Sequence, residues 1–421
     1  MAKYDFTTMV NRENSNAFKT SKEAIKTYLN LNLYEDSISM WVADMDFKVA
    51  PEIVEAVKKR AEMATFGYAG VSNQYYQALQ GWFKKRHTME FTPDHVVMSN
   101  GTLAAITATV RTFTKEGEGV IIQSPVYYPF SSITEENRRK VVDNKLIVDE
   151  NNNYSIDFED FEAKCADPKN KLFIFCNPHN PVGQIWSRED VQRLVDISKK
   201  HKVVMFSDEV HSDLIRKGET FTSALNVENS KDVIVATAAN KTFNLAGLHI
   251  SNLIIKDAFT RSRLNVQMNT SITAFNEAAA IAAYSQGEEW LEELRNVLDE
   301  NIKYMDEFIK THLPKIKFNA PQGTYLTWLD FRAYDIKEDN LLYLLSEKAR
   351  LILEGGSMFG KESEGFIRMN IACTKETLIE ALSRIKKLMN SDFKSHLKSN
   401  PKVEYTLIHQ GGSCGCSSCR H

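Results

Sequence analysis

Three residues that can do chemistry lie directly after short apolar runs. Lys241 follows VIVATAAN, and Asp208 and His211 follow VVMFS. In an open α/β sheet, the carboxyl ends of parallel strands form the edge where ligands bind. A lysine that is desolvated at such an edge has a lowered pKa, and its amine becomes a nucleophile toward carbonyl groups. Taken alone, a lysine at a strand end is more often a solvated surface residue.

Asp208 and His211 stand at the end of a run that is apolar enough to form a buried strand. An unpaired carboxylate is costly in such a place, so the sequence implies a cationic partner for Asp208. The alternative is that Asp208 caps the next helix and that His211 is a core histidine with its hydrogen bonds satisfied.

Two turns add polar groups to the same predicted edge. The segment NPHNPVG, residues 177–183, follows KLFIFC and presents the amide of Asn180 on a rigid turn, although a turn alone explains its prolines and glycine. The segment SNGTL, residues 99–103, leads from a strand into a helix. Backbone N–H groups at Gly101 and Leu103, with the Thr102 hydroxyl, can hold a phosphate there, or Thr102 is simply a helix cap.

Apolar runs alternate with amphipathic stretches from about residue 95 to residue 256, which predicts a mostly parallel sheet covered by helices. The predicted strands are His95 to Met98, Gly119 to Gln123, Leu172 to Cys176, Val203 to Ser207, Val233 to Thr237 and Ser251 to Ile255. The predicted helices are Leu103 to Phe113, Arg188 to Lys200 and Ala258 to Gln267. The fold class is therefore α/β.

A second, smaller α+β domain is expected after a helix from Glu288 to His312, which ends before Pro314. It has strands at 325–329 and 365–371 and a helix at 340–349. Pro51 opens another helix, with Ile53, Val54 and Val57 on one face. The predicted division is an N-terminal segment on the small domain (1–48), a large domain (49–287), the small C-terminal domain (288–395) and a tail (396–421).

Composition limits the kinds of partner. The 421 residues are 43% hydrophobic and 25% charged, as in soluble chains with large cores, and the net charge of -3 gives no basic patch for nucleic acid. No apolar stretch reaches the length of a signal peptide core or a membrane span, so we expect a cytoplasmic protein. Cys165, Cys176 and Cys373 are expected to be free buried thiols.

Taken together, the phosphate turn, the NPxNPxG turn, Asp-x-x-His and the lysine resemble, in this order, the fold-type I aminotransferase superfamily. The resemblance covers about residues 25 to 390 and implies the cofactor pyridoxal 5′-phosphate (PLP). It implies that Lys241 binds PLP as a Schiff base, that Asp208 keeps the pyridinium nitrogen protonated, and that Asn180 and His211 bond the ring O3′. Gly101, Thr102 and Leu103 would hold the phosphate.

Three further residues take roles from the same resemblance. Tyr127, in SPVYYPF, matches the aromatic residue that stacks on the cofactor ring and joins Lys241 as a catalytic residue; its alternative is core packing. Arg368, in GFIRMNIA, matches the arginine that binds the α-carboxylate of an amino-acid substrate, helped by Asn180, and its alternative is an arginine paired at the surface. Tyr68 would reach the phosphate of a partner chain, which implies a homodimer with active sites at the subunit interface.

The segment WVADMDF, residues 41–47, resembles the MalY/PatB branch of cystathionine β-lyases. The Ala43 N–H would then face the substrate carboxylate. His211 stands where aminotransferases usually have tyrosine, and His249 replaces an expected phosphate-binding arginine. The implied reaction is α,β-elimination from L-cystathionine or another S-substituted cysteine, which yields a thiol, pyruvate and ammonia. The alternatives are an aminotransferase of the same fold and a PLP-binding regulatory protein.

The tail lies beyond this resemblance. Cys414, Cys416 and Cys419 have the spacing C-x-C-x2-C in a Gly/Ser-rich stretch. They are candidates for binding a soft metal or for thiolate chemistry, and a dispensable extension is the equal alternative.

Overall fold

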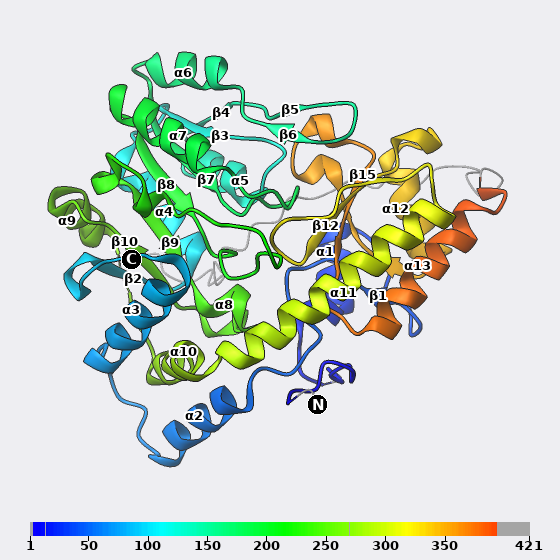
Figure 1. The fold of residues 1–421 in the computed structure, drawn as a ribbon, viewed down its shortest axis with the longest axis horizontal. Helices are drawn as coiled ribbons and strands as arrows, with labels where there is room; N and C mark the ends of the chain where they lie inside the picture. The colour runs from blue at the N-terminus through cyan, green and yellow to red at the C-terminus, as the bar shows by residue number, and fades with distance from the viewer. Residues whose placement is uncertain (1–2, 13, 269, 394–421) are drawn as a thin grey trace, which may run out of the picture.

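The computed structural model describes residues 3–12, 14–268 and 270–393 (Figure 1). One sheet contains the strands β2 (Val96–Ser99), β3 (Gly119–Ile122), β4 (Lys140–Asp143), β7 (Asn170–Cys176), β8 (Val204–Asp208), β9 (Ile234–Thr237) and β10 (Ser251–Ile254). Their order is β2-β10-β9-β8-β7-β3-β4. β10 is antiparallel to both of its neighbours and every other pair is parallel. The predicted α/β class with a mostly parallel sheet is confirmed.

The central strands are buried on both faces. Along β7, Leu172 and Ile174 belong to one apolar cluster, whereas Phe173 and Phe175 belong to another. Helices α4 (Thr102–Phe113), α5 (Pro129–Glu136) and α9 (Ala258–Gln267) supply the first cluster, and α6 (Phe158–Ala166) and α7 (Arg188–Lys200) supply part of the second. Continuous apolar runs are typical of such doubly covered strands.

β4 was not predicted from the sequence. Its residues, KVVD, are exposed or half-buried because the strand forms one edge of the sheet, next to β3 alone. Four residues with a charge at each end carry too little apolar signal to indicate a strand, and only the pairing with β3 identifies it.

Three helices pack together, namely α2 (Pro51–Glu62), α3 (Asn73–His87) and α10 (Ala274–Gln286), and α10 contacts both of the others. The predicted shared apolar face of α2 is wrong in part, since Ile53 is buried, Val57 is half-buried and Val54 is exposed. α2 packs against α10, which is itself rich in alanine and allows close approach.

A second, antiparallel sheet has the order β11-β12-β15-β14. Its strands are β11 (Lys317–Phe318), β12 (Leu326–Asp330), β14 (Glu354–Gly355) and β15 (Phe366–Asn370), and its helices are α12 (Glu338–Glu347) and α13 (Lys375–Met389). The long helix α11 (Glu288–His312) runs from α10 to α13 and so connects the two sheets (Figure 1).

The N-terminal part of the chain lies against this second sheet region. It contains α1 (Lys22–Leu29) and β1 (Ile38–Ser39), and β1 pairs in parallel with β13 (Leu351–Ile352). A small hairpin is formed by β5 (Ile147–Val148) and β6 (Tyr154–Ser155), and the short helix α8 (Ala239–Thr242) follows β9. The domain boundaries at residues 48, 287 and 395 stay a prediction.

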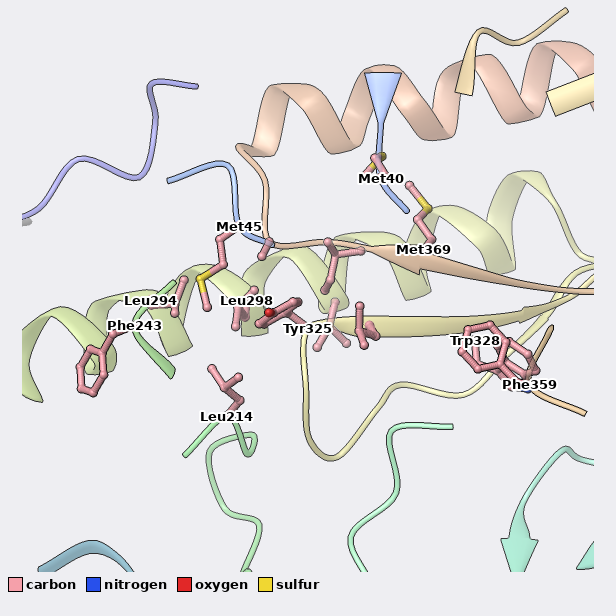
Figure 2. Packing of buried hydrophobic residues seen from close by; sticks show 14 of the residues in the cluster. Met40, Met45, Leu214, Phe243, Leu294, Leu298, Tyr325, Trp328, Phe359 and Met369 are labelled. Carbon is pink, nitrogen blue, oxygen red and sulfur yellow. The ribbon is translucent and has the colours of Figure 1, made fainter. Parts of the chain in front are cut away.

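The interior between α11 and β12 is filled by large apolar side chains (Figure 2). Leu294 and Leu298 of α11 face Tyr325, which directly precedes β12, and Met45 from the N-terminal part lies beside them. This packing fixes the segment around Met45 against both sheets.

The turn that carries Asn180 ends at Gly183, whose φ is +74° and whose carbonyl accepts the Gly323 N–H at 2.9 Å. A Cβ here would lie 2.3 Å from Pro321 Cβ, whereas a Cβ at Gly218 (φ +88°) would meet nothing within 4 Å. We expect Gly218→Ala to cost only backbone strain, about 1 kcal/mol. Gly183→Ala should cost about 1–3 kcal/mol more, because the contact with Pro321 must also open. Denaturant unfolding of both variants measures the difference, and equal losses would contradict the account.

Candidate active site

A cavity of about 640 Å³ lies where the strand ends of the larger sheet face the segment around Ala43. Eight of the predicted residues line it, namely Ala43, Thr102, Leu103, Tyr127, Asn180, Asp208, His211 and Lys241. A larger groove of about 1350 Å³ lies between α2 and α10, and none of the predicted site residues lines it. The smaller cavity is therefore the candidate active site, because the predicted site residues line it.

Lys241 enters this cavity from α8, one turn after β9 ends. Its Nζ donates a hydrogen bond to the Ala43 carbonyl at 2.9 Å. Burial, together with the nearby charge of Arg368, lowers the pKa of Lys241 to about 8, although nearby acidic groups oppose the shift. A substantial part of the amine is therefore neutral near pH 8, as a nucleophile or base requires.

Asp208 ends β8 beside Cys176 of β7, and its side chain is buried. Burial raises its pKa to about 6, opposed only in part by the Val210 N–H, at 3.3 Å, and by the charge of Lys241. A turn follows Asp208, so the alternative that it caps a helix is wrong. The carboxylate thus lacks a close cationic partner within the described chain and suits a cationic ligand group.

His211 is buried, and its Nδ1 has no hydrogen-bond partner among the described residues. Burial, with the charges of Lys241 and Arg368, lowers its pKa to about 3, so the imidazole is neutral. The alternative of a fully satisfied core histidine is therefore wrong, because one ring nitrogen remains for another group.

Arg368 lies on β15 in a buried cluster just behind the cavity wall. Its Nε donates to Glu354 at 2.8 Å, its Nη1 to the Asn180 Oδ1 at 2.9 Å and its Nη2 to the Trp41 carbonyl at 3.3 Å. An arginine paired at the surface is thus excluded. Because Asn180 uses its oxygen for Arg368, its amide N–H groups are the donors left for a ligand.

The phosphate turn has the predicted shape. Gly101, with φ +100°, is the N-cap of α4, so the alternative that Thr102 caps the helix is wrong. The Thr102 hydroxyl lies 3.1 Å from the Ser251 hydroxyl, and Thr102 and Leu103, the first two residues of α4, line the cavity. His249 lines the same end, where the resemblance expects an arginine. Such a helix N-terminus suits an anion.

Three functional candidates were missed from the sequence. Glu354 pairs with Arg368, and Tyr325 donates to the same Ala43 carbonyl as Lys241, at 3.1 Å. Asp213 lies behind α8 and accepts from Thr242, adjacent to Lys241, at 2.9 Å. Glu354 gave one usable signal, a charge directly after an apolar run, in LILEGG, whereas Asp213 in the polar segment DEVHSDL gave none. Tyr325 in GTYLTW gave none.

Other predicted residues lie elsewhere. Tyr68 is fully exposed and does not line the cavity of its own chain. Cys165, Cys176 and Cys373 are free and buried, as predicted. Cys414, Cys416 and Cys419 lie outside the described residues, and within those residues no cluster suited to a metal is found. In the described part of the chain, no helix is long and apolar enough to cross a membrane.

Comparison with known proteins places the chain in a family. It matches the model of the aminotransferase class I and II family over residues 35–385, and it belongs to that family. It is 40% identical over 357 residues to cystathionine beta-lyase PatB of Bacillus subtilis, covering 83% of this chain and 92% of the relative. Protein MalY of Escherichia coli is 30% identical, with 82% and 89% covered.

Comparison with solved structures supports the same family. Cystalysin from Treponema denticola, which contains pyridoxal 5′-phosphate, superposes with a TM-score of 0.87 at 34% identity, covering 91% of this chain and 98% of that one. A PLP-bound C-S lyase from Staphylococcus hominis superposes with a TM-score of 0.87 at 33% identity, with 92% and 98% covered. The resemblance to fold-type I enzymes and to the MalY/PatB branch is confirmed.

The raised pKa of Asp208 makes a prediction about the cofactor-free chain. Its pKa lies near 3.8 when unfolded and near 6 when folded, so its contribution to stability is present below about pH 4 and is lost as the pH rises through 6. Asp208→Asn removes this loss. We expect the variant to match the wild type at pH 4 and to exceed it by about 2–3 kcal/mol at pH 7.5.

Denaturant unfolding at the two pH values tests this expectation, with the pH 4 data as the internal control. A difference between variant and wild type that is the same at both pH values would contradict it. The same substitution should weaken cofactor binding.

Proposed function

We propose that the protein is a PLP-dependent carbon-sulfur β-lyase that acts on L-cystathionine or a related S-substituted cysteine and forms a thiol, pyruvate and ammonia. The observation that carries the proposal is the content of one cavity. A lysine with a pKa near 8 shares it with a buried carboxylate that has no close cation and an imidazole with an unpaired nitrogen. The likeness to PatB supports the same reaction.

The cavity residues fit the cofactor group by group. Asp208 suits the pyridinium nitrogen, since a cation there would restore an ordinary pKa to the carboxylate. His211 Nδ1 and the Asn180 amide suit the ring oxygen, and the N-terminus of α4 suits the phosphate. When bound, the cofactor supplies an electron sink for negative charge at the substrate Cα.

Lys241 is the residue that moves the proton. Its neutral amine takes the proton from the substrate Cα, and burial keeps enough of that amine neutral near pH 8. The C–H electron pair becomes the second bond between Cα and Cβ, and the Cβ–S bond breaks as sulfur leaves with its electrons and takes up a proton as the thiol. Water then hydrolyses the released 2-aminoacrylate to pyruvate and ammonia. Tyr127 lines the cavity, and its aromatic ring would pack against the cofactor ring.

Arg368, Asn180 and Ala43 would orient the substrate carboxylate. Arg368 is already fixed by Glu354 and Asn180, so its position needs little reorganisation on binding. The Ala43 N–H belongs to the segment that faces Lys241. Tyr68, exposed in one chain, would complete the phosphate site of a partner, so we also propose a homodimer located in the cytoplasm.

The aminotransferase alternative shares all of these residues, and a solved structure titled a putative aminotransferase, from Clostridium difficile, is 36% identical. An absorbance spectrum of the purified protein with L-cystathionine and no keto acid, with pyruvate assayed in the same tube, separates the two. Pyruvate formation with a lasting visible cofactor band supports the lyase. Loss of the band without pyruvate supports the aminotransferase, and absence of any band in protein supplied with PLP rejects both.

Replacement of Lys241 gives a sharper prediction. Lys241→Ala should lower pyruvate release at least about 10³-fold, because it removes both the covalent attachment and the base. The matched control is Lys310→Ala, an exposed lysine on α11 paired with Asp306, which should keep wild-type activity. If cells that carry Lys241→Ala nevertheless keep the wild-type phenotype, the result would support the alternative that the protein is a PLP-binding regulatory protein.

A further inference from the structure

Tyr325 shares an acceptor with Lys241. Its hydroxyl donates to the Ala43 carbonyl at 3.1 Å, and the Lys241 Nζ donates to the same oxygen at 2.9 Å. A carbonyl oxygen has two lone pairs and can accept both bonds at once. The two donors come from residues 84 positions apart in sequence, so this arrangement exists only in the folded chain.

The ring of Tyr325 is held firmly. It is almost fully buried and lies among Met45, Leu298 and Leu214 in the apolar cluster of Figure 2, with the His211 ring edge-on at 6.0 Å. Its backbone carbonyl accepts the Ile371 N–H at 2.9 Å. Among the described residues, the hydroxyl has one acceptor, which is the Ala43 carbonyl.

The acceptor is held just as firmly. The carbonyls on either side of Ala43, those of Val42 and Asp44, accept from the Asn370 amide at 2.7 and 2.8 Å. The Met45 N–H donates to Asn244 at 3.0 Å. Because neither side can drift, the oxygen of Ala43 stays at a fixed distance from both the hydroxyl and the amine.

We propose that Tyr325 is a positioning residue for Lys241, which keeps the Ala43 carbonyl occupied and so frees the amine to act as nucleophile and base. This inference rests on the proposed function. A carbonyl with one donor already bound is a weaker partner for an ammonium group than a carbonyl with none, so Tyr325 favours the neutral amine. When Lys241 turns away, the hydroxyl also prevents a partly buried oxygen from losing its last hydrogen bond.

The remaining charges around Lys241 would not change in a Tyr325 variant. They are Arg368 on β15, Asp44 beside Ala43, Asp208 on β8 and Glu354 on β14, and neutral His211 also faces it. Tyr325→Phe removes one oxygen and leaves the ring packing intact. Any change in the protonation of Lys241 would then come from the lost hydroxyl.

The test is the rate at which the cofactor-free, full-length chain takes up pyridoxal 5′-phosphate, followed by visible absorbance across the pH range. Attachment needs a neutral lysine, so the rate reports the protonation of Lys241 without turnover. The wild type should inflect near pH 8. Tyr325→Phe should shift the inflection upward by about half a pH unit to one unit, because one hydrogen bond is lost from Ala43.

Tyr75→Phe is the matched control, since Tyr75 is a buried tyrosine that donates to Asn252 at 2.6 Å and does not line the cavity. It should lower the melting temperature about as much as Tyr325→Phe and leave the inflection unchanged. A Tyr325→Phe inflection at the wild-type pH, or a wild-type inflection near 10, would overturn the role of Tyr325. A wild type that takes up no cofactor and releases no pyruvate would reject the proposed function itself, so the two failures differ.

Discussion

The buried ion pair between Arg368 and Glu354 holds together the parts of the chain that form the cavity. The two residues are direct partners in the antiparallel register of β14 and β15, so the sheet itself sets their approach. The remaining guanidinium nitrogens reach Asn180, at the edge of the larger sheet, and the Trp41 carbonyl. One cation thus connects three segments that are far apart in sequence. Removing either charge would leave the other buried without compensation.

Two aspartates in the segment DEVHSD show how surroundings assign roles to identical side chains. Asp213 accepts from His87 at 2.7 Å, Trp82 at 3.0 Å and Thr242 at 2.9 Å, and although burial alone would raise its pKa, these bonds bring it below the ordinary value. Asp208 is equally buried but has one backbone donor, and its pKa rises. Asp213, which lies behind α8, therefore stabilises the folded, cofactor-free protein. Asp208 destabilises the same state until a cationic group binds beside it.

The sequence predicted those parts of the site that local order determines. Asp208, Asn180 and Lys241 each follow an apolar run, and neighbouring parallel strands bring such ends to one edge, so their meeting in one cavity could be foreseen. The contact of Tyr325 could not be foreseen, because its partner Ala43 is 282 residues away and the contact depends on how the second sheet docks. The partner of Glu354 could not be foreseen either, because it depends on the register of β14 and β15. The prediction that Val54 of α2 shares the apolar face was wrong for a related reason. Which face of α2 is buried depends on its packing against α10, and the sequence of α2 alone does not show this packing.

The segment from Trp41 to Met45 shows why a short motif can indicate a branch of a family without revealing its purpose. Its five carbonyls accept from donors in several parts of the chain. In order from Trp41 to Met45, these are Arg368, Asn370, Lys241 with Tyr325, Lys19 with Asn370, and Asn244 with Arg12. A segment without regular structure must satisfy its backbone in this way wherever water is excluded. Three of these donors, Lys241, Arg368 and Tyr325, belong to the site or its wall. The hydrogen bonds that satisfy the backbone of this segment therefore also hold Lys241, Arg368 and Tyr325 close to one another beside the cavity.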